Sequence, residues 1–134
     1  MKHEFELTVR STDVDMIGHV NHAQYLVYME WARVEWMRGL GLTLGELKRR
    51  QILPVIVNVK VDYLKELLYD EKAKVISEPL RKGNKSSVIR QRIQNGSGDV
   101  VCEAEITWVM MDAVHRKATS LPREMEDWFQ AVTC

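Results

Sequence analysis

Apolar and polar residues alternate along several segments of this chain, a pattern typical of β-strands that bury one face. The longest alternating segment covers residues 53 to 63, and its apolar positions are Leu53, Val55, Val57, Val59, Val61 and Tyr63. We expect one long strand with all six side chains on the same face. The same pattern predicts shorter strands at residues 3–10, 67–79, 86–95, 100–110 and 115–119, with turns at 81–85 and 96–99.

A different period, that of an α-helix, occupies residues 22–39, between the first strand and the long one. Its apolar residues recur at spacings of four, three and four, which places them on one helix face: Tyr25, Met29, Ala32 and Trp36. Asn21 is suited to cap the start of this helix, and Gly41 lies just past its end. Shorter helices are predicted at residues 43–50, where a threonine and a glutamate have capping-box spacing, and over about ten residues from Pro122.

The order of these elements is a strand, one long helix, and then strands joined by tight turns. Short turns join only antiparallel neighbours, so the later strands should form an antiparallel meander. One sheet must bury the apolar face of the single long helix. The sequence therefore predicts one α+β domain over residues 1–134, in which the sheet wraps around the helix. Such a unit leaves a sheet edge uncovered, and a dimer that continues the sheet across two chains would cover that edge.

The composition supports a single globular domain and excludes several classes of partner. The chain has 134 residues, 46% of them hydrophobic, and its 19 basic residues balance 19 acidic ones. This balance gives no overall field that would attract nucleic acid or an anionic membrane. The N-terminus lacks the apolar run of a signal peptide, and no segment reaches the roughly 20 apolar residues of a membrane helix, so we expect a cytoplasmic protein. Cys102 and Cys134 are expected to be free thiols of a reducing compartment.

The densest group of chemically active side chains lies in residues 13–22, where the chain enters the long helix. The segment contains Asp13, Asp15, His19 and His22. A helix N-terminus has unpaired amide hydrogens and a partial positive charge, which stabilise an oxyanion. A carboxylate in the same loop could attack a carbonyl or activate a water molecule. The two requirements of acyl-ester cleavage therefore occur together, although the spacing also fits a capped turn in which the aspartates bond their own backbone.

A zinc site formed by Asp15, His19 and His22 is another interpretation of this segment. The two histidines lie on either side of the helix start rather than one turn apart on a regular helix, and the sequence contains no fourth ligand cluster. This spacing disfavours a metal hydrolase, and we expect neither a metal nor a cofactor.

The segment from Asp13 to Tyr25 resembles the signature of the 4-hydroxybenzoyl-CoA thioesterase-like hotdog proteins. The shared features are an aspartate three residues before a glycine, a short apolar–polar passage into a helix, and a tyrosine at the end of the first helical turn. The His-Val-Asn form at residues 19–21 is similar to the bacterial long-chain acyl-CoA thioesterase III branch, and residues 30–33 are similar to the Glu-x-Ala-Arg often found on that helix. The order of elements matches the family over nearly the whole chain, which implies the hotdog fold.

The resemblance implies catalytic roles for three residues. Asp15 matches the catalytic carboxylate, acting as nucleophile or general base, and the backbone amide of His22 matches the donor that polarises the thioester carbonyl. Gly18 matches a loop glycine where close backbone approach is needed, and the His22 side chain matches a histidine that could assist acid–base chemistry in some branches. Asp13 is interpreted as a carboxylate that structures the loop. Arg33 stands where one enediyne-type branch has arginine, but that branch lacks the aspartate, so we assign Arg33 a structural role.

Other residues are expected to bind the substrate. Asn21 should cap the helix first and contact the ligand second, and Tyr25 should pack and hydrogen-bond rather than react. The active site should lie between two chains, with the long strand near Val57 to Val61, and Val59 in particular, facing the partner's loop. The phosphates of CoA need basic groups at the rim, and the candidates are Arg81, Lys82 and Lys85, with Arg90 and Arg92 on the following strand. An acyl pocket could be shaped by Met29, Trp31 and Trp36, although these residues could equally be plain core.

The sequence thus predicts an acyl-CoA thioesterase that hydrolyses acyl-CoA or aroyl-CoA to a free acid and CoA, as a homodimer or as a homotetramer made of two dimers. An acyl-carrier-protein thioester is an alternative substrate. A non-catalytic acyl- or lipid-binding hotdog protein is an alternative of another class, which the presence of Asp15 beside a helix N-terminus disfavours. A dehydratase or hydratase on this fold would need a histidine–aspartate pair in another pattern, which the sequence does not contain.

Overall fold

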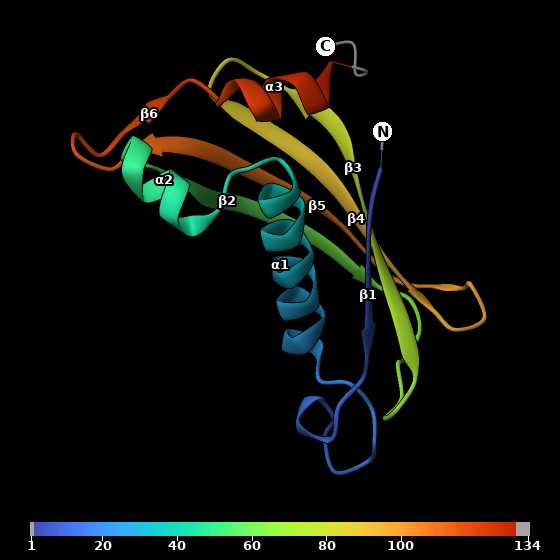
Figure 1. The fold of residues 1–134 in the computed structure, drawn as a ribbon. Helices are drawn as coiled ribbons and strands as arrows, with labels where there is room; N and C mark the ends of the chain where they lie inside the picture. Colours follow the sequence, from blue (N-terminus) through green and yellow to red (C-terminus); the bar gives the residue numbers. More distant parts are fainter. Residues whose placement is uncertain (1, 131–134) are drawn as a thin grey trace.

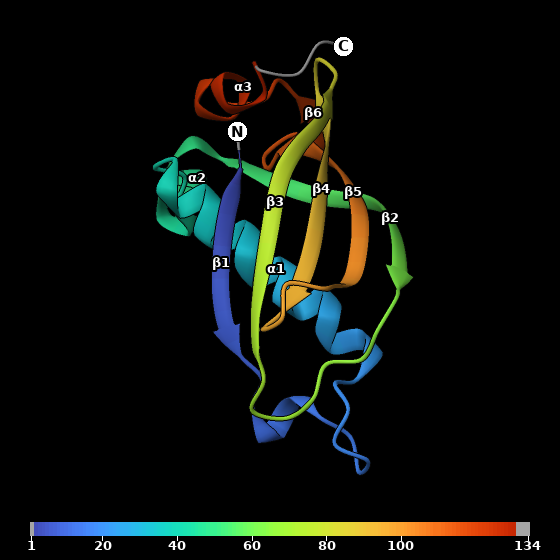
Figure 2. The same cartoon turned by 90° about the vertical axis from the view of Figure 1, so that its right-hand side faces the viewer.

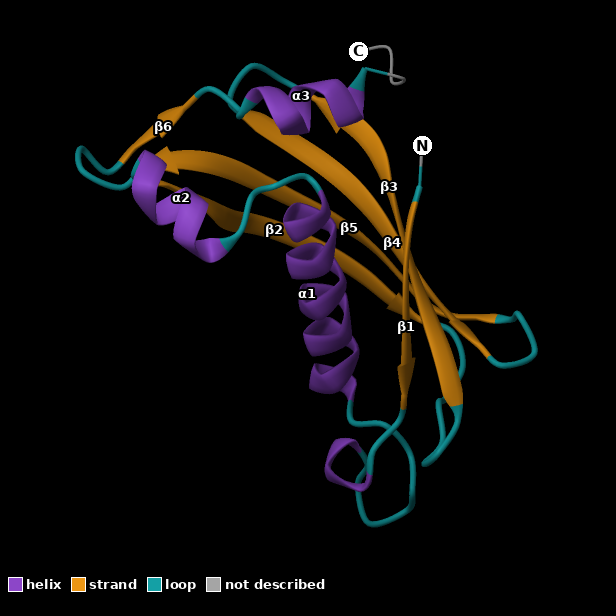
Figure 3. Cartoon of the chain, viewed as in Figure 1, coloured by secondary structure: helices purple, strands orange, loops and turns teal. Residues whose placement is uncertain are grey.

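The computed structural model describes residues 2–130, and its helices and strands follow the predicted order (Figure 1, Figure 3). The elements are β1 (His3–Thr8), a short 3₁₀ turn (Ser11–Asp13), α1 (His22–Gly39), α2 (Leu44–Arg50), β2 (Ile52–Tyr63), β3 (Lys72–Lys82), β4 (Ser86–Asn95), β5 (Val100–Asp112), β6 (Lys117–Thr119) and α3 (Arg123–Phe129). The 3₁₀ turn was not predicted, because it lies in a segment without hydrophobic periodicity.

The strands form one antiparallel sheet in the order β1-β3-β4-β5-β2, with β6 pairing the end of β5. Figure 1 and Figure 2 show the sheet curling around α1, which lies against its concave side, while α3 lies across one end. The prediction of an α+β hotdog fold, with an antiparallel sheet wrapped around one long helix, is confirmed. The loop that joins β1 to α1 lies at the opposite end of the molecule from α3.

The face of α1 that packs on the sheet is the one that the sequence predicts. Its four apolar residues are at most 3% exposed: Tyr25, Met29, Ala32 and Trp36. The ring of Trp36 lies 5.4 Å from Trp108 of β5 and 4.5 Å from Trp128 of α3, measured between ring centroids. Aromatic pairs at such separations add stability beyond the area that they bury. This aromatic cluster closes the core at the C-terminal end of α1. The N-terminal end of the helix is next to the β1–α1 loop instead.

A small group of polar side chains lies inside this mainly apolar interface, centred on Gln91. The side chain of Gln91 in β4 is fully buried and donates to the backbone oxygen of Met29 and to Ser77 Oγ, both at 3.0 Å. The Gln91 oxygen accepts a hydrogen bond from Nη1 of Arg33 at 2.9 Å. A buried amide is costly unless its polar atoms are paired, and here each of them has a partner. The middle of α1 is therefore hydrogen-bonded to the sheet.

The long strand β2 differs from the predicted single apolar row. Ile56 lies opposite Trp108 of β5 and Asn58 lies opposite Thr107, which leaves Val57 as the extra residue of a β-bulge. A bulge shifts the alternation by one residue and moves the following side chains to the other face. The prediction that six apolar side chains share one face is therefore wrong. The side chains on the helix side of β2 are Ile52, Pro54 and Ile56 before the bulge, and Val59, Val61 and Tyr63 after it.

β3 begins later and ends later than the alternation predicts. The strand covers Lys72–Lys82, whereas residues 67–79 were expected to form a strand and residues 81–85 a turn. Residues 64–71 instead form an irregular connection. There, the Leu67 amide donates to the hydroxyl of Tyr25 at 3.0 Å, and the Leu67 oxygen accepts from the Val20 amide at 2.9 Å. Tertiary hydrogen bonds therefore override the local pattern in this connection.

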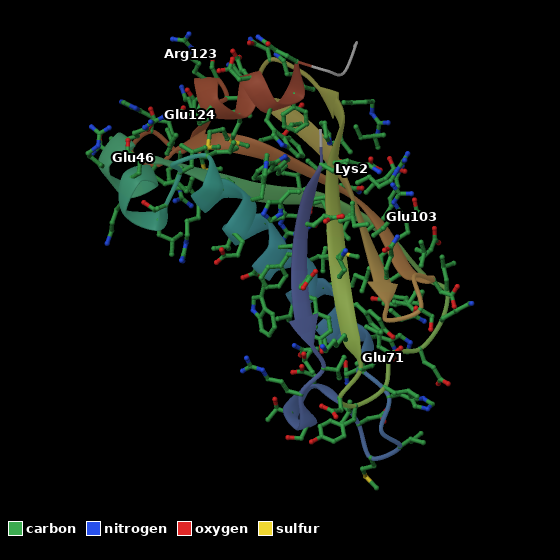
Figure 4. The ribbon with its side chains drawn as sticks, turned by 45° about the vertical axis from the view of Figure 1, so that its right-hand side comes forward. Lys2, Glu46, Glu71, Glu103, Arg123 and Glu124 are labelled. Atoms are coloured by element: carbon green, nitrogen blue, oxygen red, sulfur yellow. The ribbon has the colours of Figure 1, made fainter. Side chains whose placement is uncertain are left out.

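α2 and α3 are linked by ion pairs at the end of the sheet away from the β1–α1 loop. Arg50 lies 2.6 Å from Glu124 of α3 and 2.7 Å from Glu46 of α2, and Figure 4 shows the two glutamates close together. Hydrogen bonds from Arg49 and Arg50 lower the pKa of Glu46 to about 2. The Glu46 carboxylate is therefore occupied, and only the Thr43 half of the predicted capping box forms, with the Glu46 amide 3.2 Å from Thr43 Oγ1.

The structure describes one of the two cysteines. Cys102 of β5 is a free thiol that is fully buried in the core, and this burial raises its pKa to about 12. It is therefore an inert core residue, because the thiolate is the reactive form of cysteine. Cys134 lies outside the described residues, as does the end of the ten-residue helix predicted from Pro122, and α3 itself covers Arg123–Phe129.

Candidate active site

The loop between β1 and α1 is a tight turn that presents Asp15. Val14 forms an antiparallel bridge with Val20, and the Asp15 amide donates to the His19 oxygen at 2.9 Å. Gly18 has a φ of +87°, in the left-handed region that other residues disfavour. A Cβ at this position would meet no atom within 4 Å. Within this chain, therefore, the glycine is required by its backbone angle. The close backbone approach expected from the sequence is not the reason.

The Asp15 carboxylate is exposed and is held by the backbone of its own turn. Its Oδ1 accepts hydrogen bonds from the amides of Ile17 at 2.9 Å and His19 at 3.2 Å. These amides, that of Ile17 first, lower the pKa of Asp15 below its usual value. The group is therefore ionised at neutral pH. Because both bonds go to Oδ1, Oδ2 is left for a water molecule or a substrate carbonyl.

α1 begins directly after this turn, and Asn21 caps it as predicted. The Asn21 side chain accepts from the Ala23 amide and its backbone oxygen accepts from the Gln24 amide, both at 2.9 Å. Neither bond uses the amide of His22, the first residue of the helix. Amides of a first helical turn have no partner inside the helix and carry partial positive charge. The His22 amide is therefore left to bind an anionic or carbonyl oxygen.

A polar cleft of about 330 Å³ joins the loop, the helix start and the end of β2. Four of its lining residues were predicted as site residues: Asp15, Asn21, His22 and Tyr25. The others are His19, Val20, Tyr63, Leu64, Lys65 and Glu66. The fold thus brings the candidate carboxylate, the helix N-terminus and two candidate binding residues together, while Gly18 shapes the turn behind them and Val59 does not line this cleft.

Tyr25 holds one wall of the cleft in place. Its hydroxyl accepts from the Leu67 amide at 3.0 Å and donates to the Lys65 oxygen at 3.3 Å, and burial raises its pKa. The Tyr25 ring lies 5.5 Å from that of Tyr63, whose hydroxyl donates to the His22 oxygen at 3.3 Å. Tyr25 therefore has the packing and hydrogen-bonding contacts expected of it, and it keeps its proton near neutral pH.

Asp13 lies behind the turn and is only 6% exposed. Its Oδ2 accepts from the hydroxyl of Tyr28 at 2.7 Å and from the Arg10 amide at 3.0 Å. Its backbone oxygen accepts from the Asn21 amide at 3.1 Å. These bonds connect the end of β1, the loop and α1. Asp13 is therefore a structural carboxylate of the loop, in agreement with the sequence-based interpretation.

The family of the chain follows from comparison with known proteins. Residues 9–129 match the model of the thioesterase-like superfamily. The chain belongs to this superfamily. The long-chain acyl-CoA thioesterase of Escherichia coli is 28% identical to this chain over 123 residues, which are 91% of this chain and 92% of that enzyme. The family resemblance inferred from residues 13–25, and with it the expectation of a thioester hydrolase, is confirmed.

Solved structures share the fold of this thioesterase-like chain. A Staphylococcus aureus protein solved in complex with CoA has a TM-score of 0.91 at 16% identity, over 97% of this chain and 85% of that one. A 1,4-dihydroxy-2-naphthoyl-CoA thioesterase from Synechocystis has a TM-score of 0.88 at 18% identity, over 96% of each chain. At such identities the likeness establishes the fold, and function has to be argued from the site.

The basic residues considered for the CoA phosphates lie far from the cleft within one thioesterase-like chain. Arg81 and Lys82 are at the end of β3 and Lys85 is in the next turn, at the opposite end of the sheet from the loop (Figure 2). β3 has 11 residues, and at about 3.3 Å per residue its ends are roughly 33 Å apart. Arg81 and Lys82 lie within 4.0 Å of glutamates, as do Arg90 and Arg92 on β4. A single chain does not bring these residues to its own cleft.

An apolar groove lies farther along α1 and β2 than the polar cleft. It consists of two hollows of about 230 and 340 Å³, which share Val34, Met37 and Pro54. The residues named from the sequence for an acyl pocket do not line it. Met29 and Trp36 belong to the core, and Trp31 is 38% exposed and packs against Tyr28. The groove is therefore a better candidate for an acyl site than the aromatic residues of α1.

Outside residues 13–25, four residues of the cleft were not predicted from the sequence: Tyr63, Leu64, Lys65 and Glu66. The signal that could have found them is the loss of alternation after Tyr63, which marks the end of β2. His19 was named among the chemically active side chains of the loop and as a possible metal ligand, but it was given no catalytic role. Among residues 2–130, no group of three His, Cys, Asp or Glu side chains lies close enough to hold a metal ion, and no helix in that part of the chain is long and apolar enough to cross a membrane.

Proposed function

We propose that this chain is an acyl-CoA thioesterase that hydrolyses its substrate to a free acid and CoA, with Asp15 as the catalytic carboxylate. One observation carries the proposal. An ionised carboxylate and the open N-terminus of α1 line the same cleft, so a nucleophile or base stands beside a site that stabilises an oxyanion. The name of the Escherichia coli relative, a long-chain acyl-CoA thioesterase, supports the same substrate class.

Two chemical routes fit this arrangement. Asp15 Oδ2 could attack the thioester carbon to form an anhydride that water then hydrolyses, or Asp15 could take a proton from a water molecule that attacks the same carbon. Both routes place negative charge on the carbonyl oxygen, where the His22 amide and the α1 dipole would stabilise it. The low pKa of Asp15 keeps the carboxylate ionised, as both routes require. The His22 side chain, which also lines the cleft, would assist proton transfer.

The proposed enzyme is a homodimer, alone or as half of a tetramer, that pairs the β2 edges of two chains. β2 is an edge strand of 12 residues, and its exposed apolar side chains include Ile56, Val57 and Val59. A long apolar edge invites pairing with another strand. In such a dimer, Val59 of one chain would lie near the loop of the other, so the substrate site would form between the two chains.

The acyl group and the CoA moiety would then occupy different surfaces. The apolar groove beside Val34, Met37 and Pro54 would take the acyl or aroyl group. Because the three basic candidates are far from the cleft of their own chain, Arg81, Lys82 and Lys85 would meet the CoA phosphates only from a neighbouring chain. Acyl-CoA of the cytoplasm is the proposed substrate.

The decisive experiment is thiol release from a panel of acyl-CoA and aroyl-CoA esters by the wild type and by Asp15→Asn. The substitution keeps the shape of the side chain and removes its charge. We expect kcat to fall by more than about 10²-fold, because neither route proceeds without the carboxylate, while the circular dichroism spectrum stays unchanged. A variant with near-normal kcat would end the assignment of Asp15. Binding of the esters without turnover by the wild type would indicate a non-catalytic acyl-binding protein instead.

A further inference from the structure

A histidine and a glutamate form a close pair on the rim of the cleft. Nδ1 of His19, in the β1–α1 loop, lies 2.8 Å from Oε2 of Glu66, in the connection between β2 and β3. Both side chains line the cleft that contains Asp15. The pair therefore joins two segments that are far apart in the sequence, next to the candidate catalytic carboxylate.

The backbone on both sides of this pair is fixed. His19 forms an antiparallel bridge with Leu68, and the flanking Val20 amide donates to the Leu67 oxygen at 2.9 Å. The Tyr25 hydroxyl holds the Leu67 amide from the other side at 3.0 Å. The His19 amide also donates to Asp15 Oδ1 at 3.2 Å. The imidazole therefore has a set position relative to the Asp15 carboxylate.

Stability does not explain the pair. The His19 and Glu66 side chains are 38% and 57% exposed, and ion pairs this accessible to water contribute little to folding. A role in proton transfer would explain it, because an imidazole is the most common proton carrier in enzymes.

The contact with Glu66 determines which nitrogen of His19 exchanges its proton. An ionised carboxylate only accepts hydrogen bonds, so Nδ1 must carry a hydrogen toward Glu66. Nε2, on the opposite edge of the ring, is then the nitrogen that gains and loses a proton. This division of roles between an imidazole and the carboxylate that orients it is the one used in general acid–base catalysis. The other titratable groups around the cleft are Asp15, His22, Tyr25, Tyr63 and Lys65.

We propose that His19 is a second catalytic residue, a general acid that delivers a proton from Nε2 to the departing sulfur, and that Glu66 is its positioning residue. The inference rests on the proposed thioesterase function. When the tetrahedral intermediate collapses, the C–S bond breaks and its electron pair stays on sulfur. Sulfur then takes the Nε2 proton, which yields the CoA thiol and neutral His19. In the water route, Asp15 holds the proton taken from water and passes it through solvent to His19, which restores both groups. In the anhydride route, water hydrolyses the anhydride to the product acid and the Asp15 carboxylate, and the proton that the acid releases returns to His19 through solvent.

The test compares two esters of the same acyl group that differ in their leaving thiol. One is the CoA ester, whose alkyl thiolate is a poor leaving group, and the other is the thiophenyl ester, whose thiolate leaves without a proton. For His19→Gln we expect kcat on the CoA ester to fall by about 10²-fold, with an unchanged KM, and to fall far less on the thiophenyl ester.

Two further variants complete the test. Glu66→Gln keeps the side-chain shape, removes the charge that orients His19, and should show a smaller loss with the same preference for the thiophenyl ester. Asp99→Asn is the matched control, because it removes another exposed ion pair of the same connection, Lys65 to Asp99 at 3.4 Å, and it should change neither rate. Equal losses on the two esters, or no loss, in an active enzyme would overturn the role of His19 alone. A wild type that cleaves neither ester would overturn the proposed function, and this role with it.

Discussion

Removing the hydroxyl of Tyr28 should destabilise the loop that carries Asp15. This hydroxyl donates to Oδ2 of Asp13 at 2.7 Å, and the two side chains are 0% and 6% exposed. Tyr28→Phe leaves the ring in place and takes one of two close donors from a buried carboxylate, since the Arg10 amide remains at 3.0 Å. Hydrogen bonds to buried charged groups contribute about 1.5–3 kcal/mol each. We therefore expect a loss of about 2 kcal/mol in the free energy of unfolding.

Urea unfolding followed by tryptophan fluorescence measures this loss directly. For a chain of this size, a loss of about 2 kcal/mol corresponds to a fall in Tm of roughly 6–10 °C. The matched control is Tyr69→Phe, which removes the same atom from a side chain that is 58% exposed and should stay within about 0.5 kcal/mol of the wild type. Well below the Tm, kcat should change little in Tyr28→Phe, because the hydrogen bonds of Asp15 itself remain.

Equal stabilities of Tyr28→Phe and Tyr69→Phe would contradict a stabilising role for the Tyr28–Asp13 hydrogen bond. That outcome would mean that the Asp13 carboxylate is satisfied without the tyrosine, and that the loop is held by its backbone bonds alone.

Three other predictions concern the turn, the α2–α3 link and the β2 edge. Gly18→Ala and Gly98→Ala place a Cβ at nearly equal φ angles of +87° and +86°, with no neighbour within 4 Å. Each substitution should lower the free energy of unfolding by about 1–2 kcal/mol, but only Gly18→Ala should slow thiol release. Equal activities of the two variants would show that Gly18 has no role in the site. The Glu46 pKa of about 2 lies below its unfolded value, so its bonds stabilise the fold above about pH 4.5 and are lost as the pH falls toward 2. The stability difference between wild type and Glu46→Gln in urea should therefore shrink below about pH 4.5 and vanish only below about pH 2. A difference that is constant with pH would refute this linkage. Val57→Lys should convert the proposed dimer to monomers, as measured by light scattering, and reduce activity. Val114→Lys, at a similarly exposed position, should change neither property. A dimer that survives Val57→Lys excludes this edge as the interface.

The sequence predicted the elements whose pattern is local. The helical period of Tyr25 and Trp36 identified the buried face of α1, and Asn21 was recognisable as its cap from its position alone. Asp15 and His22 lie seven positions apart in the chain, so a local pattern was enough to bring both to the start of α1. The resemblance of residues 13–25 to a known family then supplied the proposed chemistry.

The parts that the sequence did not predict depend on contacts between distant segments. The bulge at Val57 appears only when β2 is aligned with β5, because a run of alternating valines is equally regular with or without it. Glu66 reaches the cleft because Tyr25 and Val20 bind the connection around Leu67. The basic residues near Lys82 were chosen as CoA-phosphate candidates for their charge. The direction of β3 places them at the end of the sheet opposite the cleft.

The buried amide of Gln91 has a consequence for how α1 is placed. Apolar contacts are non-directional, so they specify the position of a helix along a sheet less sharply than a hydrogen bond does. Gln91 binds a particular backbone oxygen of α1 and a particular arginine one turn later. A shift by one residue would leave these polar atoms buried without partners, at about 1–3 kcal/mol for each. Gln91 therefore helps to fix the position of α1 along the sheet, and with it the position of the first helical turn at the far end of α1.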